Sequence, residues 1–120
     1  MKNNGINDIS KQIEYKGNIY KLIFNFNVME EIQEEYGTLE KWGELTDLVE
    51  PNAKAVKFGL RAMFNEAIDI ENEENGTNKE PLTLKQVGRM VTEIGLDLMT
   101  QKLNKTVIES SKGEEKNVYS

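Results

Sequence analysis

The 120-residue chain contains no cysteine and no histidine. Without cysteine it cannot form disulfides, thiolate metal sites or a thiol nucleophile. Without histidine it lacks the commonest metal ligand and the most frequent general base. These two absences argue against an enzyme, and no catalytic, cofactor or metal site is expected.

Long apolar runs are also missing. No stretch approaches the ~20 apolar residues that a membrane-spanning helix requires. The first ten residues, MKNNGINDIS, lack the apolar centre of a signal peptide. The sequence therefore predicts a soluble, cytosolic protein that does not bind membranes.

Positive charge is in short supply. Fifteen lysines and arginines face 21 aspartates and glutamates, which leaves a net charge of -6. Binding to nucleic acid depends on cationic side chains that neutralise phosphates. Only Arg61 and Arg89 are arginines, the residue best suited to forked phosphate contacts. A nucleic-acid partner is therefore not expected.

Only 38% of the residues are apolar, and the mean hydropathy is -0.61. The apolar residues are concentrated in the middle of the chain, and the polar ones in the two ends and one loop. At this length the pattern predicts a single domain with a modest core. We expect a flexible N-terminus over residues 1–11, one domain over 12–104, and a flexible polar tail over 105–120.

Two short runs rich in β-formers predict a hairpin. Residues 12–15 and 19–26 flank Lys16-Gly17-Asn18, which is typical of a tight turn. The two-residue period places four apolar side chains of the second run on one face: Tyr20, Leu22, Phe24 and Phe26. A lone hairpin is marginal in water, so this face needs helices packed against it.

The remainder predicts helices. The first is expected to begin at Asn27, with Glu30 completing a capping box, and to end at Gly37. A short second helix or turn follows at 38–45, a third helix covers about 52–70, and a last helix, capped by Thr83 and Gln86, reaches about 103. Between them, residues 71–81 (ENEENGTNKEP) predict a mobile acidic loop.

The predicted fold is therefore α+β and mainly α, with an N-terminal β-hairpin packed on a small bundle of three to four helices. Glu30/Glu34 and Glu31/Glu35 are carboxylate pairs at helical spacing. In di-metal bundles such pairs are accompanied by a Glu-x-x-His motif, which this chain lacks. A solvated acidic face is the better interpretation.

Five apolar residues are candidates for contact with a partner protein. Trp42, the only tryptophan, is either a core plug or an interface anchor. Phe58 lies off the main apolar stripe of its helix, so either that helix is buried on two sides or the ring meets a partner. A second ridge of the last helix raises the same question and consists of Leu96, Met99 and Leu103.

The order of the segments resembles the tail assembly chaperones of long-tailed bacteriophages and prophages of low-GC Gram-positive hosts. The matching features span residues 13–103. They are an apolar strand ending in Phe24-Asn25-Phe26-Asn27, an acidic helix closed by Tyr36-Gly37, the segment Leu39 to Trp42, a helix with Leu60-Arg61-Ala62-Met63-Phe64, and the Leu82-Thr83-Leu84 entry to Val87-Gly88.

This resemblance implies a non-catalytic chaperone that coats the tape measure protein during tail morphogenesis and also recruits tail tube subunits. It implies a location in the host bacterial cytoplasm and absence from the mature virion. Self-association is left open. The alternatives are a virion structural protein of the tail or head–tail connector, and, below it, an acidic nucleic-acid mimic that inhibits a host enzyme.

Overall fold

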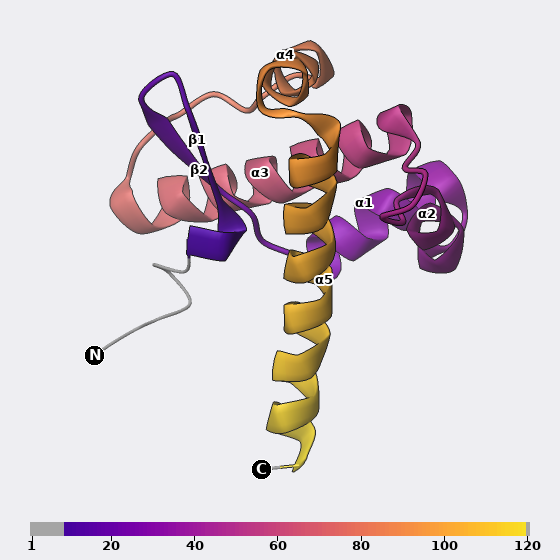
Figure 1. Cartoon of the computed structure of the whole chain (residues 1–120). Coiled ribbons are helices and arrows are strands. Elements are labelled where there is room, and N and C mark those ends of the chain that lie inside the picture. The colour runs from indigo at the N-terminus through magenta and orange to yellow at the C-terminus, as the bar shows by residue number, and fades with distance from the viewer. Residues whose placement is uncertain (1–8, 120) are drawn as a thin grey trace.

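The structure, a computed structural model, describes the backbone of residues 9–119 and the side chains of residues 10–111. Within this part of the chain, a two-stranded hairpin is followed by five α-helices (Figure 1). In chain order the elements are η1 (Ile9–Lys11), β1 (Gln12–Tyr15), β2 (Asn18–Lys21), α1 (Phe26–Tyr36), α2 (Leu39–Leu45), α3 (Ala53–Asn75), α4 (Leu84–Ile94) and α5 (Leu96–Tyr119). The predicted α+β, mainly α fold is confirmed, and the described residues form five α-helices where the sequence predicts three to four.

The hairpin forms where the sequence predicts it. Tyr15 pairs with Asn18, so Lys16 and Gly17 form a two-residue turn with φ values of 51° and 81°. Positive φ at both positions suits the right-handed twist of the two strands. β2 ends at Lys21, five residues before the end of the predicted run.

The apolar face of the hairpin is confirmed except at its last position. The rings of Tyr20 and Phe64 pack edge to face, with 5.8 Å between their centroids, and Leu22 and Phe24 are buried. Phe26, in contrast, is 74% exposed. The chain turns into α1 at this point, so the two-residue alternation of side chains no longer applies.

Helix α1 is capped by Asn25 and not by Asn27, which corrects the predicted capping box. The Asn25 side-chain oxygen accepts a hydrogen bond from the Val28 amide at 3.2 Å. Asn27 instead donates to Glu66 of α3 at 3.1 Å. Gly37 ends the helix, as predicted, with a φ of 90°.

Helix α3 is the axis of the core. Asn52 caps its start, near the predicted position, but the helix continues to Asn75 and includes five residues that the sequence assigns to a loop. On its main apolar face it buries Val56, Leu60, Met63, Phe64 and Ala67, and on other sides also Ala55, Phe58 and Ala62. The other elements pack their buried apolar side chains around it: Ile13, Leu22, Phe24, Val28, Ile32, Trp42, Val87, Met90, Met99 and Leu103.

The connector, residues 76–83, runs back from α3 to α4 past the hairpin (Figure 1). Two asparagines of α3 bind it through both ends of their side-chain amides. Asn72 accepts from the Lys79 amide at 3.0 Å and donates to the Lys79 carbonyl at 3.1 Å. Asn65 accepts from the Leu82 amide at 2.7 Å and donates to its carbonyl at 3.0 Å. The connector is therefore held against α3.

The predicted last helix is divided in two. The capping box of Thr83 and Gln86 is confirmed at the start of α4. Gly95 ends α4 with a φ of 114°, a conformation that favours glycine, and α5 begins at the next residue. A Cβ at Gly88 would have the Lys57 side chain as its nearest neighbour, and one at Gly95 would meet nothing within 4 Å, so neither glycine marks a close approach of another backbone.

Helix α5 also continues beyond Asn104, where the sequence predicts that the domain ends. Thr106 is buried, and the Ser110 hydroxyl donates to the Phe24 carbonyl at 3.0 Å. The packed part of the chain thus includes residues that were assigned to the tail. None of the helices within residues 9–119 combines the length and apolarity needed to cross a bilayer.

Candidate functional site

The residues that the sequence nominates for partner binding lie mainly in the core. Trp42 is 2% exposed, Phe58 8%, and Met99 and Leu103 0%, while Leu96 is partly buried. The structure brings Trp42 and Leu103 together around Gly59 of α3, whereas Phe58 lies on another side of that helix. In this conformation the set does not form an accessible surface.

Trp42 closes the core between α2 and α3. Its indole Nε1 donates to the Ala55 carbonyl at 3.0 Å, which satisfies the one polar atom of the buried ring. The carbonyl of Trp42 accepts from the Thr46 hydroxyl, and the Asn104 side chain donates to the Thr46 carbonyl at 2.8 Å. Trp42 is therefore a buried core residue in this structure, which is the first of its two interpretations.

Phe58 packs between α1 and α3. Its ring meets Tyr36 edge to face, with 5.5 Å between centroids, and the Arg61 guanidinium lies 5.3 Å from its centroid. Burial raises the pKa of the Tyr36 hydroxyl, and the nearby Glu35 carboxylate raises it further. Helix α3 is therefore buried on two sides, and Phe58 packs inside the protein on the second of them.

The glutamates of α1 are exposed, and Glu31 forms an ion pair with Arg61 of α3 at 3.4 Å. Within the described residues, no three histidine, cysteine, aspartate or glutamate side chains lie together as a metal site.

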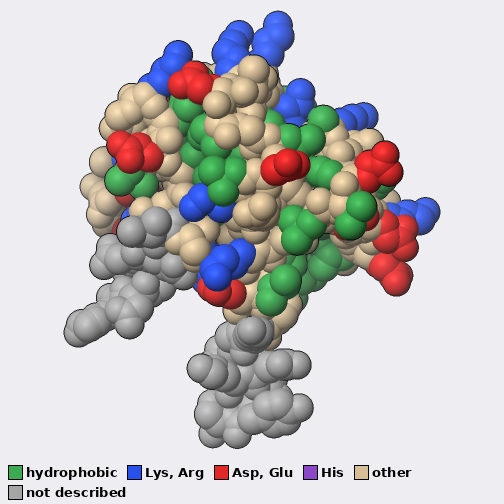
Figure 2. Space-filling view, in the orientation of Figure 1, with side chains coloured by type: hydrophobic (Ala, Val, Ile, Leu, Met, Phe, Trp, Pro, Cys, Tyr) green, Lys and Arg blue, Asp and Glu red, His purple; other side chains and the backbone are tan. Residues whose placement is uncertain are grey.

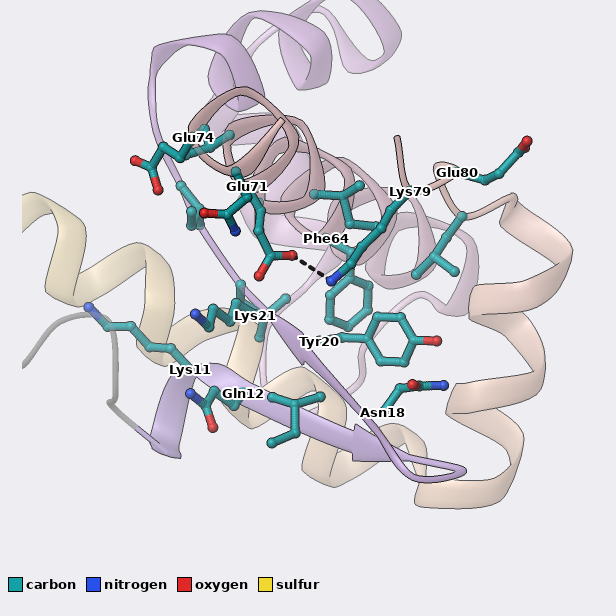
Figure 3. Close-up of a pocket in the computed structure, with 18 of the residues that line it drawn as sticks. Lys11, Gln12, Asn18, Tyr20, Lys21, Phe64, Glu71, Glu74, Lys79 and Glu80 are labelled. Carbon is teal, nitrogen blue, oxygen red and sulfur yellow. Dashed lines mark hydrogen bonds and ion pairs between the residues drawn. The ribbon is translucent and has the colours of Figure 1, made fainter. Parts of the chain in front are cut away.

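The structure contains a groove that the sequence does not reveal. It has a volume of about 1040 Å³ and lies between β2, the C-terminal half of α3 and the connector (Figure 3). We call it the hairpin groove. Its lining residues are Lys11, Gln12, Gly17 to Ile23, Phe64, Ala67, Ile68, Ile70, Glu71, Glu74, Asn75, Lys79, Glu80 and Leu82.

The groove has an apolar floor. Phe64, Ala67 and Ile68 contribute it from α3, and Leu82 adds to it from the connector. Ile19 of β2 also lines the groove and is 60% exposed. Phe64 and Ala67 are buried, whereas Ile68 and Leu82 are half-buried, so the accessible apolar surface comes mainly from Ile19, Ile68 and Leu82. A partly exposed apolar concavity is the usual form of a binding site.

Charges of both signs surround this floor. Lys11 and Lys21 come from the hairpin side, whereas Glu71 and Glu74 come from α3 (Figure 3). The Glu71 carboxylate binds the Lys79 ammonium of the connector at 3.0 Å. The rim is therefore basic along the hairpin and acidic along α3.

Sequence reasoning missed this groove because its walls are distant in the chain. The one local signal was the outer face of the second predicted strand, where Ile19 and Ile23 flank Lys21. The connector wall depends on the bonds of Asn65 and Asn72, and asparagines on a helix do not by themselves predict such contacts.

Acidic and basic side chains are interspersed over the face of the molecule in Figure 2, with apolar side chains between them. That face carries no continuous acidic surface.

No protein-family model, no curated protein and no solved structure matches this chain.

Proposed function

We propose that this chain is a non-catalytic tail assembly chaperone of a long-tailed bacteriophage or prophage. In this proposal it binds the tape measure protein in the host cytoplasm, and also tail tube subunits, before the tail is complete. The order of segments from residue 13 to 103 supports the family. The hairpin groove, with its apolar floor and charged rim, is the structural observation that carries the proposal.

The physical requirements of such a chaperone agree with the groove. A tape measure protein exposes apolar faces until the tail tube closes around it. A protein that protects those faces needs an open apolar surface from which the partner can be released. Its net charge of -6 would keep the complex soluble.

The rival functions fit the molecule less well. An acidic nucleic-acid mimic needs one continuous carboxylate surface, and the face in Figure 2 mixes both charges. A virion structural protein remains the stronger rival, because structural subunits also carry apolar contact surfaces.

The decisive experiment is co-expression with the product of the large, coiled-coil-rich reading frame expected downstream of the gene. We expect the two proteins to co-purify, and Ile19→Asp to weaken the complex because it places a charge at the groove. Val49→Asp is the matched control, since Val49 is 94% exposed and does not line the groove.

Mass spectrometry of purified virions separates the two phage functions. The chaperone is expected to be nearly absent from mature particles, whereas a structural protein would be present in fixed stoichiometry. Absence of the downstream reading frame, or a constant copy number in virions, would contradict the chaperone function.

A further inference from the structure

The hairpin groove lies along an edge of the β-sheet. From β1 only Gln12 contributes to the lining, whereas every residue from Gly17 to Ile23 does so. Side chains of a strand alternate between two faces, so a groove over one face would be lined by alternate residues. A lining by seven consecutive residues indicates that the groove follows the strand's backbone.

The pairing of the hairpin shows which backbone groups point into this space. The Leu22 amide donates to the Lys11 carbonyl at 2.8 Å, so Leu22 faces β1. The direction of the backbone N–H and C=O groups alternates from residue to residue along an antiparallel pair. The backbone groups of Ile19, Lys21 and Ile23 therefore face away from β1. Among the described residues these outward groups have no hydrogen-bond partner.

We propose that the open edge of β2 binds an extended segment of a partner protein, which adds a third strand to the hairpin inside the groove. Exposed strand edges are templates for such pairing. This proposal rests on the proposed function only for the partner's identity, because the edge and the groove stand without it.

The groove also specifies the chemistry of the added segment. Side chains on the inner face of the new strand would lie over the α3 wall of the groove, where Ile68 and Ile70 are half-buried. The new side chains on that face must therefore be apolar. The residue opposite Lys21 would share its outer face. Lys21 forms no ion pair with any residue that the structure describes, so an acidic side chain fits there. The preferred segment therefore reads apolar–acidic–apolar.

A second copy of this chain is a poorer occupant. A two-fold pairing of β2 with β2 that uses Ile19, Lys21 and Ile23 together has its centre at Lys21. Two lysines would then lie directly opposite each other, which is destabilising. The partner's own strand, with a carboxylate in that place, avoids this repulsion.

The probe for the test is a fluorescent, end-capped peptide with the sequence Lys-Thr-Val-Glu-Val-Thr-Lys, added to the full-length protein. Amide hydrogen exchange followed by NMR should show slower exchange at Ile19 and Lys21. The amides of Tyr20 and Leu22 already bond to β1 and should change little. Equal protection at all four positions, or none, would overturn the proposal.

Backbone methylation gives a second, independent readout. In an antiparallel third strand the amide of the peptide's glutamate points to β2, and those of its valines point away. Methylation of the glutamate nitrogen should weaken binding roughly tenfold, since it removes a hydrogen bond and blocks the edge. Methylation of one valine nitrogen should be tolerated. If the peptide binds as a parallel strand, methylation of a valine nitrogen should weaken binding and methylation of the glutamate nitrogen should be tolerated, which also supports strand addition. If both methylations are tolerated equally, strand addition is contradicted.

A charge exchange tests the acidic preference. Lys21→Glu should weaken binding of the glutamate peptide about fivefold. A peptide in which lysine replaces the glutamate should bind this variant as well as the glutamate peptide binds the native protein. Lys54→Glu is the matched control, because Lys54 is exposed and does not line the groove. Loss of affinity in both variants, or in neither, would refute the assigned register.

Other occupants predict different results. Protection of Ile19 that grows with protein concentration in the absence of peptide would show that a second copy occupies the edge. If the peptide binds only after residues 1–8 are removed, the chain's own N-terminus occupies the edge. Either result refutes a partner segment here. If the tape measure product still co-purified, the proposed function would stand and only its location in the groove would fail.

Discussion

The indole of Trp42 lies directly over Gly59, so close that a Cβ at Gly59 would overlap the ring carbon Cζ2. The same Cβ would stand 3.2 Å from Leu103. Gly59 therefore lets α2 and α5 meet at the surface of α3. This contact connects three helices that the sequence presents as separate segments.

Gly59→Ala is predicted to destabilise the protein by about 1–3 kcal/mol, because the indole must move or the helices must separate. The matched control is Gly43→Ala in α2. A Cβ at Gly43 would meet nothing within 4 Å. That variant should gain about 0.5–1 kcal/mol from helix propensity. Urea unfolding measures both, and equal effects would contradict the close packing at Gly59.

Phe58 and Phe26 form a second matched pair. Phe58 is 8% exposed and packs on Tyr36, whereas Phe26 is 74% exposed. Phe58→Ala should cost about 3–5 kcal/mol, a large fraction of the stability of a small domain. Phe26→Ala should change stability by no more than about 0.5 kcal/mol. A thermal melt that Phe58→Ala left unchanged would return Phe58 to the candidates for partner contact.

Asn25→Ala is predicted to cost about 1 kcal/mol through loss of the α1 cap. The substitution also removes the 2.8 Å hydrogen bond from the Asn25 amide to the Glu66 carboxylate. Asn27→Ala removes a longer, exposed bond to the same carboxylate and should cost less than about 0.5 kcal/mol. Urea unfolding of both variants tests the assignment. A larger cost at Asn27 would restore the cap that the sequence predicts.

Tyr36 should make stability depend on alkaline pH. Its hydroxyl is buried without a hydrogen-bond partner in the described structure, and its pKa in the folded state is raised above the usual 10. Above pH 10 the unfolded chain therefore loses this proton first, so stability falls as pH rises through and beyond that value. Below about pH 9 this group contributes no slope.

Tyr36→Phe removes the ionising group and leaves no unsatisfied hydroxyl. Its stability at pH 7 should equal or exceed that of the native chain. Between pH 9 and 11 it should lose less stability than the native chain does. Urea unfolding across this range checks both points. Parallel losses in the two proteins would assign the alkaline transition to other groups.

Local patterns predicted much of the fold because local forces decide those features. The turn at Lys16 and Gly17, the Thr83 cap with Gln86, and the stop at Gly37 depend on backbone conformation and on hydrogen bonds within a few residues. The cap of α1 was placed two residues late because Asn25 and Asn27 are both suitable caps. Their different contacts with Glu66 of α3 are not visible in the sequence.

The candidate site was predicted less well. Burial of Phe58 depends on which helices surround α3, and periodicity along one helix does not show that. The length of α3 was underestimated because its last turn is acidic and polar. It is held by the Asn72 bonds to the connector, which a composition argument does not include.

By itself, the sequence determined which residue types are present, with no cysteine and no histidine, and it predicted the α+β class and the succession from hairpin to helices, because local spacing sets these directly. Only the tertiary structure decided that Trp42, Phe58, Met99 and Leu103 belong to the core. It also decided that the open edge of β2 borders a groove. Those outcomes depend on contacts between residues far apart in the chain, where packing against α3 determines which apolar side chains are covered.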